Sequence, residues 1–150
     1  MKIDWNLPHL PAADWAIKNA RSTYPNLTKE QINAIRNSIS RFYIQGLNVG
    51  QVWELLSPYF DKETAKIISC TEITRASANS EQNEGNKLQK LLNGERIFKI
   101  WQTNNDNLGC PICRNLQGKL VDINSPFAKD IFISPAHLGC RCWISGSPDF

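Results

Sequence analysis

The feature that most constrains this chain is a group of cysteine and histidine residues near its end. Cys110 and Cys113 form a Cys-x-x-Cys pair, and His137, Cys140 and Cys142 follow as a second group. Thiolate and imidazole groups at these spacings are typical zinc ligands, and a tetrahedral zinc ion takes four of them. Because 23 residues separate the two groups, a shared ion would close a loop and tie the end of the chain to its middle.

Five candidate ligands compete for four positions. We favour the set Cys110, Cys113, His137 and Cys140, with Cys142 as the competing thiolate. Two other interpretations stay open, since the cysteines could instead be buried reduced thiols that pack like small hydrophobic residues, or could form a disulfide. A disulfide framework is disfavoured because the number of cysteines, five with Cys70, is odd and residues 1–10 lack the apolar stretch of a secretory signal.

The metal is predicted to be structural. A catalytic zinc usually keeps an open position with a general base nearby, whereas five candidate ligands crowd this site. The chain has no His-Glu-x-x-His motif, and Pro111 lies inside the Cys-x-x-Cys pair rather than before it, as the zinc deaminase signature requires. A redox role for the pair requires a strand–helix–strand context, whereas strands and hairpins are predicted around it. We therefore predict a non-enzymatic protein without a small-molecule substrate.

Length and charge set the broad class of the chain. Its 150 residues suffice for about one domain with its own hydrophobic core. The 17 basic and 14 acidic side chains give a net charge of +3, spread evenly along the chain. A net charge this small does not by itself indicate a nucleic-acid-binding surface. No apolar run reaches the roughly 20 residues that cross a bilayer, so no membrane contact is expected.

Capping residues and apolar spacing predict helices in the region after the first 26 residues. Thr28 followed by Gln31 is a capping box, and isoleucines then recur at helical spacing until Gly46 supplies the stop. Asp61 caps a later helix, and the polar stretch over 80–85 predicts a break. The expected helices cover 28–46, 47–56, 61–79 and 87–92, after an N-terminal arm over 1–26 with a short helix over 14–21.

The last third of the chain predicts a small antiparallel β element. Its segments are rich in apolar and β-branched side chains between turn residues. Because so small a sheet is not stable alone, the fold class is α+β, with a helical N-terminal half packed on a small antiparallel β element with a zinc knuckle. The expected domain spans 27–150, helical over 27–94 and β and zinc-binding over 95–150. The strand candidates are 96–103, 119–123, 131–134 and 142–145.

A polar segment over 71–79 is the other distinctive stretch. Glu72 and Arg75 lie three residues apart on one helix face, so they can form an ion pair. The simpler interpretation is a solvated pair that contributes little to stability. The sharper one is that this polar face packs against the β element and meets Arg141, so that the three residues form a structural polar cluster.

The order of these features resembles a known family. The matching segments are Leu27–Glu30, 46–56, 60–68, 71–79, Lys99–Trp101, Asp106, Cys110–Cys113, Leu116–Lys119 and Pro135–Cys142. In this order they resemble the phage Mu protein F-like family of minor head, or head morphogenesis, proteins, over about residues 27–146. The family's terminal block is Pro-x-His-Pro-x-Cys-Arg-Cys, and here Leu138 replaces the second proline. Cys70 also departs from the small residue or arginine common before Thr-Glu.

The resemblance implies a component of the virion or procapsid that acts near the portal and is present in the host cytoplasm during assembly. Portal and capsid proteins would be its partners, with phage DNA as a further candidate, and it would aid head assembly and DNA ejection. The alternatives are a zinc-knuckle nucleic-acid-binding module and a nuclease or toxin-associated domain. The nucleic-acid module would need a basic and aromatic stripe. Its only candidates are Lys87, Lys90, Arg96, Lys99 and Trp101.

Overall fold

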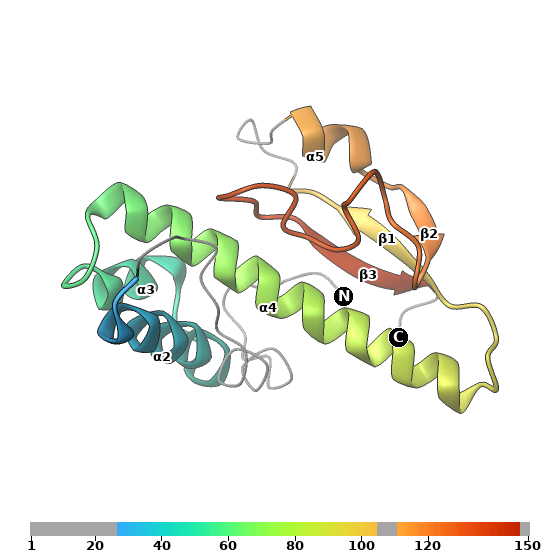
Figure 1. The fold of residues 1–150 in the computed structure, drawn as a ribbon, viewed down its shortest axis with the longest axis horizontal. Coiled ribbons are helices and arrows are strands. Elements are labelled where there is room, and N and C mark those ends of the chain that lie inside the picture. The colour runs from blue at the N-terminus through green and yellow to red at the C-terminus, as the bar shows by residue number, and fades with distance from the viewer. Residues whose placement is uncertain (1–26, 105–110, 148–150) are drawn as a thin grey trace.

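The computed structural model describes residues 27–104 and 111–147. The predicted N-terminal arm over 1–26, with its helix over 14–21, lies outside the described residues, and so does Cys110. Figure 1 shows the arrangement of the helices and strands. The elements are α2 Lys29–Gln45, α3 Val49–Leu56, α4 Lys62–Leu91, β1 Phe98–Gln102, α5 Pro111–Leu116, β2 Leu120–Asp122 and β3 Trp143–Ser147.

The helices α2 and α3 both begin at capping boxes. The Thr28 hydroxyl accepts a hydrogen bond from the Gln31 amide, and the Gln31 side chain accepts one from the Thr28 amide, as the sequence predicts. Asn48 and Gln51 form the same arrangement at the start of α3. Helix α2 stops at Gly46, whose φ of 68° lies in the left-handed region that favours glycine.

Helix α4 is continuous over 30 residues, so the predicted break over 80–85 is wrong. Part of this polar stretch faces the interior of the protein, whereas Asn83 and Glu84 are exposed. Ser80 and Glu81 are both buried, and the Gln82 side chain donates to the Ile123 carbonyl at 2.7 Å. Packing against the C-terminal part therefore overrides the weak helix propensity of the segment.

The sheet has three antiparallel strands in the order β2-β1-β3. Phe98 in the central strand pairs with Asp122 on one side and with Ser147 on the other. The predicted antiparallel β element is confirmed, but segment 131–134 is not a strand and holds only an isolated bridge between Ala128 and Ile131. Its Phe132 carbonyl accepts a hydrogen bond from the buried side chain of Lys99.

A short helix, α5, contains the second cysteine of the Cys-x-x-Cys pair. The strands predicted on either side are confirmed as β1 and β2, which pair antiparallel, but the helix between them was not predicted. Pro111 occupies the first helical position, where its missing N–H costs nothing. Cys113 and Leu116 lie three residues apart on one face of this helix, and both are buried. The helix therefore turns the Cys113 thiol toward the interior of the protein.

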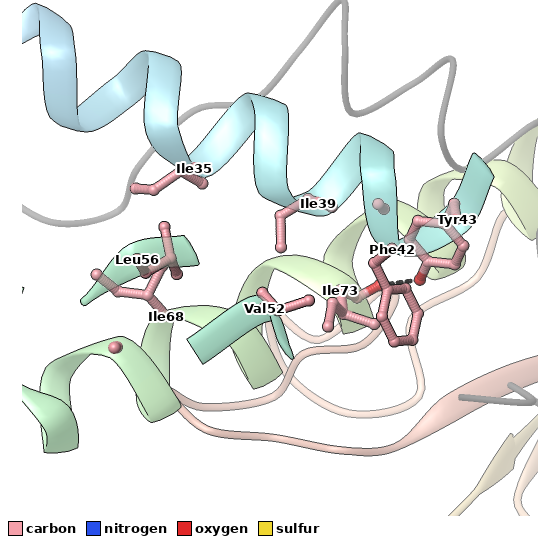
Figure 2. Close-up of a cluster of buried hydrophobic side chains, with 10 residues drawn as sticks. Ile35, Ile39, Phe42, Tyr43, Val52, Leu56, Ile68 and Ile73 are labelled. Carbon is pink, nitrogen blue, oxygen red and sulfur yellow. Dashed lines mark hydrogen bonds between the residues drawn. The ribbon is translucent and has the colours of Figure 1, made fainter. Parts of the chain in front are cut away.

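Two clusters of buried side chains form the core, and α4 contributes to both. The first joins α2 and α3 to the start of α4 and includes Phe42, Val52 and Ile68 (Figure 2). The second joins α4, through Ala78, to the sheet and includes Trp101 together with three cysteines. Figure 1 shows the same division, with α2 and α3 beside one half of α4 and the sheet beside the other. Within the described ranges, no helix is long and apolar enough to cross a membrane.

Candidate metal centre

Three potential metal ligands converge from two separate segments. Cys113 comes from α5, and His137 and Cys140 come from the loop that leads into β3. The Cys113 Sγ lies 3.2 Å from the His137 Nε2 and 3.8 Å from the Cys140 Sγ. All three ligand atoms lie within 4.8 Å of one another.

These separations fit a zinc ion. Tetrahedral corners with Zn–S bonds of about 2.3 Å and Zn–N bonds of about 2.0 Å place two sulfurs roughly 3.8 Å apart and a sulfur and a nitrogen roughly 3.5 Å apart. The sulfur–sulfur distance of 3.8 Å matches, and the sulfur–nitrogen distance of 3.2 Å is a few tenths of an ångström shorter. Two sulfurs and an imidazole nitrogen are also the donor set that zinc prefers.

The His137 ring is oriented by its own backbone neighbour. Its Nδ1 lies 2.7 Å from the Leu138 carbonyl oxygen. Because a carbonyl can only accept, we assign the ring hydrogen to Nδ1, which leaves the lone pair on Nε2, the atom that faces Cys113. A hydrogen bond to the second ring nitrogen is the usual way to fix a metal-binding histidine.

The ligand loop is attached to α4 by two threonines. Thr74 donates from Oγ1 to the Cys140 carbonyl at 2.6 Å, and the Gly139 amide donates to Thr71 Oγ1 at 2.7 Å. Gly139 has a φ of 77°, a conformation that side chains with a Cβ rarely adopt. The left-handed turn at Gly139 and the two hydrogen bonds together hold Cys140 against the helix.

The three thiols of this region influence one another. Hydrogen bonds from Cys113 and then Cys142 lower the pKa of the Cys140 thiol. Cys113 also acts to lower the pKa of Cys142, but Cys140 and burial outweigh it, so the net shift is upward. All three thiols are buried, and none of them is in a disulfide. A buried sulfur that is stabilised as a thiolate is suited to hold a cation.

The structure brings together three of the five predicted ligands and places a fourth beside them. Cys142 interacts with the thiols of both Cys113 and Cys140, although it is not within the tight group of three ligand atoms. Cys110 lies outside the described residues. The choice between Cys142 and Cys110 as a fourth ligand therefore stays a prediction.

The predicted polar cluster has one ion pair at its centre. The Arg75 Nε lies 3.3 Å from a carboxylate oxygen of Glu72. Burial raises the pKa of Glu72 to about 7, against the opposing effect of the Arg75 charge. Burial also raises the pKa of Cys70, and the Arg141 charge opposes that shift. Arg141 thus lies near Cys70, two positions from Glu72 on α4, and a direct meeting with Glu72 stays a prediction.

A buried lysine connects the sheet, α4 and the ligand loop. The Lys99 side chain is 1% exposed, and its Nζ donates to the Gln82 side chain at 3.1 Å and to the Phe132 carbonyl at 2.7 Å. Burial lowers the pKa of Lys99 to about 8. Trp101 is also fully buried. Two of the five residues considered for a nucleic-acid stripe are therefore inside the protein.

Sequence reasoning missed the residues that position the ligands. Thr71 and Thr74 lie in the distinctive polar segment over 71–79. There, the sequence indicated a role only for the charged residues Glu72 and Arg75. The sequence did contain a signal for them. The two threonines are three positions apart, so their hydroxyl groups lie on one helix face and can contact the same neighbouring segment. Lys99 and Gln82 carried no comparable signal, because a lysine in a strand is usually exposed.

The fold is that of an α+β protein in which one long helix contributes to two cores. Beside the sheet, two buried thiols and a half-buried imidazole form a cluster that could hold a metal ion. The family profile described as phage Mu protein F like protein matches residues 29–145. The chain belongs to this family, whose members are generally structural proteins of phage head morphogenesis. No curated protein and no solved structure matches the chain at a significant level.

Proposed function

We propose that this chain is a non-enzymatic minor head protein that acts as an adaptor near the portal, with α5 and the loop before β3 joined by a structural zinc ion. Cys113, His137 and Cys140 would bind the ion together with a thiolate from Cys142 or Cys110. Membership of the head morphogenesis family supports the cellular role. The observation that carries the zinc assignment is the convergence of two sulfurs and one ring nitrogen within 4.8 Å.

The composition of the cluster supports a structural ion over a catalytic one. A further thiol, that of Cys142, interacts with the sulfurs of Cys113 and Cys140, so a fourth protein ligand is at hand and no open position is needed. Among the described residues, the group contains no carboxylate that could serve as a general base. These features favour a closed site, which is typical of zinc that stabilises a fold.

The ion would supply cohesion that the small C-terminal part otherwise lacks. A three-stranded sheet of this size needs a partner surface to be stable, and α4 provides one through the contacts of Thr71 and Thr74. Zinc would join α5 to the same loop, because Cys113 comes from α5 and Cys140 from the loop. The free energy of metal binding would then be folding free energy for this half of the protein.

Native mass spectrometry of the full chain, expressed with zinc, tests the metal assignment. We expect one zinc ion per chain, and we expect Cys113→Ser to lose most of it. Cys70→Ser is the matched control, because this thiol lies near the site but outside the group of ligand atoms. Comparing Cys142→Ser with Cys110→Ser identifies the fourth ligand, since only one of them should lose zinc. A folded wild-type protein without metal would refute the assignment.

The adaptor role is tested by co-expression with the portal and capsid proteins of the same phage. We expect a complex with the portal protein at low stoichiometry, present for the wild type and for Cys70→Ser. Proheads assembled without the chain should show reduced yield of complete heads. Proheads that assemble and mature normally without it would contradict the role.

The nucleic-acid alternative is tested separately by titrating the zinc-loaded protein into duplex and single-stranded DNA. We expect no binding at about 50 mM salt, where electrostatic contacts to phosphates are strong. Burial of Lys99 and Trp101 removes the centre of the proposed stripe. Tight binding that falls steeply with salt would instead favour the nucleic-acid module.

A further inference from the structure

A groove lies on the helical half, and none of the residues that line it belongs to the candidate metal centre. It is formed along α2 by a stripe that includes Glu30 and Ala34, and across from it by Glu54, Leu55 and Tyr59 at the end of α3 and the turn beyond. Its volume is about 540 Å³, enough to accept several side chains. The Gln31 side chain donates to the Tyr59 carbonyl at 3.2 Å and so fixes the two walls relative to each other.

The groove combines apolar walls with negative charge. Leu55 and Ala34 are half-buried at its sides, and Tyr59 is 44% exposed. Glu30 and Glu54 are exposed, no cation lines the groove, and neither carboxylate forms an ion pair within the described residues. The chemistry therefore fits an occupant that presents an apolar side chain beside a positive charge.

The same chain carries such a group at the C-terminal end of α4, which we call the α4 tip and define as residues 87–92. Leu91 is 78% exposed, the highest value among the exposed large hydrophobic residues of the described chain, and Leu92 is 41% exposed. Lys90 is exposed beside them, and so is Lys87, whose Nζ lies 3.1 Å from a carboxylate oxygen of Glu84. Exposed leucines that adjoin each other at a helix end are the kind of surface that marks a protein contact.

From these two surfaces we infer that the α4 tip of one copy of this chain docks into the α2–α3 groove of a second copy. Leu91 would enter between Leu55 and Tyr59, and the lysines of the tip would face Glu30 and Glu54. The helical half with the groove and the tip lie toward opposite ends of the described body (Figure 1), so one copy cannot satisfy its own groove with its own tip.

The contact would be heterologous, because the tip and the groove are different surfaces. A contact of this kind leaves one groove and one tip open in every dimer and adds further copies until a ring closes or a filament forms. A single helix tip buries less area than a standard stable interface. We therefore expect a dissociation constant between about 10 µM and 1 mM for each contact. This inference does not depend on the zinc assignment.

Sedimentation equilibrium on the zinc-loaded full chain tests the inference. We expect the average mass to rise with concentration beyond that of a dimer, and the association to weaken about tenfold or more in the tip variant Leu91→Ser. The matched control Leu120→Ser changes another exposed leucine, on β2, and should associate like the wild type. The groove variant with Glu30→Lys and Glu54→Lys should also lose association, whereas Glu63→Lys, at an exposed site on α4 outside the groove, should not.

Mixing the two defective proteins gives the sharpest test. The tip variant keeps an intact groove and the groove variant keeps an intact tip, so an equimolar mixture should form a dimer that grows no further. Circular dichroism spectra that match the wild type establish that both variants are folded. A wild-type protein that stays monomeric at about 1 mM, a self-association that neither variant changes, or a mixture that stays monomeric would each overturn the inference. A monomer that still binds one zinc would leave the proposed metal site intact.

Discussion

The Thr74 hydroxyl on α4 donates a hydrogen bond to the backbone carbonyl of Cys140, 66 residues later in the chain, at a distance of 2.6 Å. Both residues are buried, so the carbonyl cannot turn to water if the hydroxyl is lost. This bond connects the helix that unites the two cores directly with a predicted metal ligand. The long helix therefore positions the site as well as supporting the sheet.

Replacing Thr74 with valine is expected to lower the free energy of unfolding by about 1–3 kcal/mol, because the buried Cys140 carbonyl loses its donor while side-chain volume is nearly conserved. Urea denaturation of the zinc-loaded protein measures this change. Thr74→Ser keeps the hydroxyl and should retain most of the stability. Equal stability of Thr74→Val and the wild type would show that the bond contributes nothing.

Replacing Gly139 with alanine is expected to cost about 1–2 kcal/mol, because φ is 77° there and a Cβ is strained in the left-handed region. No atom lies within 4 Å of the added Cβ, so the cost would come from the backbone alone. Gly139→Asn, which tolerates this conformation better, should cost less than Gly139→Ala. Thermal unfolding with zinc present ranks the three proteins, and an asparagine variant less stable than the alanine one would contradict this explanation.

Removing the metal is expected to loosen the C-terminal part while the helical half stays folded. The two halves have separate clusters of buried side chains, and only the second contains the cysteines. Hydrogen exchange after treatment with a chelator should show amides over 111–147 exchanging about a hundredfold faster, with α2 and α3 little changed. Uniform acceleration throughout the described chain would mean that the two halves unfold as one unit.

The pH dependence of stability is expected to carry a contribution from Glu72. Its pKa rises from 4.5 to about 7 in the folded protein through burial, so the folded state binds more protons than the unfolded chain between those values. The free energy of unfolding therefore falls as pH increases through this window, by about 3 kcal/mol at most for this group.

Substituting Glu72 with glutamine tests that contribution, because an amide does not titrate. The difference in stability between Glu72→Gln and the wild type should shift in favour of the variant as pH increases from 5 to 8. Comparing differences removes the effect of protonating the metal ligands, which both proteins share. Glu95→Gln, at an exposed position, should show a constant difference, and a constant difference for Glu72→Gln as well would refute the predicted pH effect.

Local signals in the sequence predicted much of the helical half correctly. The capping box of Thr28 and Gln31 and the stop at Gly46 act within one helical turn, so they can be recognised without knowing the rest of the fold. The candidate ligands could also be recognised, because thiol and imidazole side chains in close pairs have few other uses. The sequence indicated which residues could bind a metal ion, but it did not indicate which of them lie close together in the folded protein.

Tertiary contacts decided the features that local signals got wrong. In the stretch over 80–85, which stays helical, the Gln82 side chain bonds to the Ile123 carbonyl and to Lys99 of the central strand. In segment 131–134, which is not a strand, the Phe132 carbonyl accepts from Lys99.

By itself, then, the sequence determined the boundaries of α2 and α3, the start of α4 and the identity of the potential metal ligands, since these depend on residues close together in the chain. Only the tertiary structure decided that Cys113 meets His137 and Cys140 and that Thr74 holds their loop. The physical reason is that these contacts join residues 24 to 66 positions apart, and their formation depends on how whole elements pack.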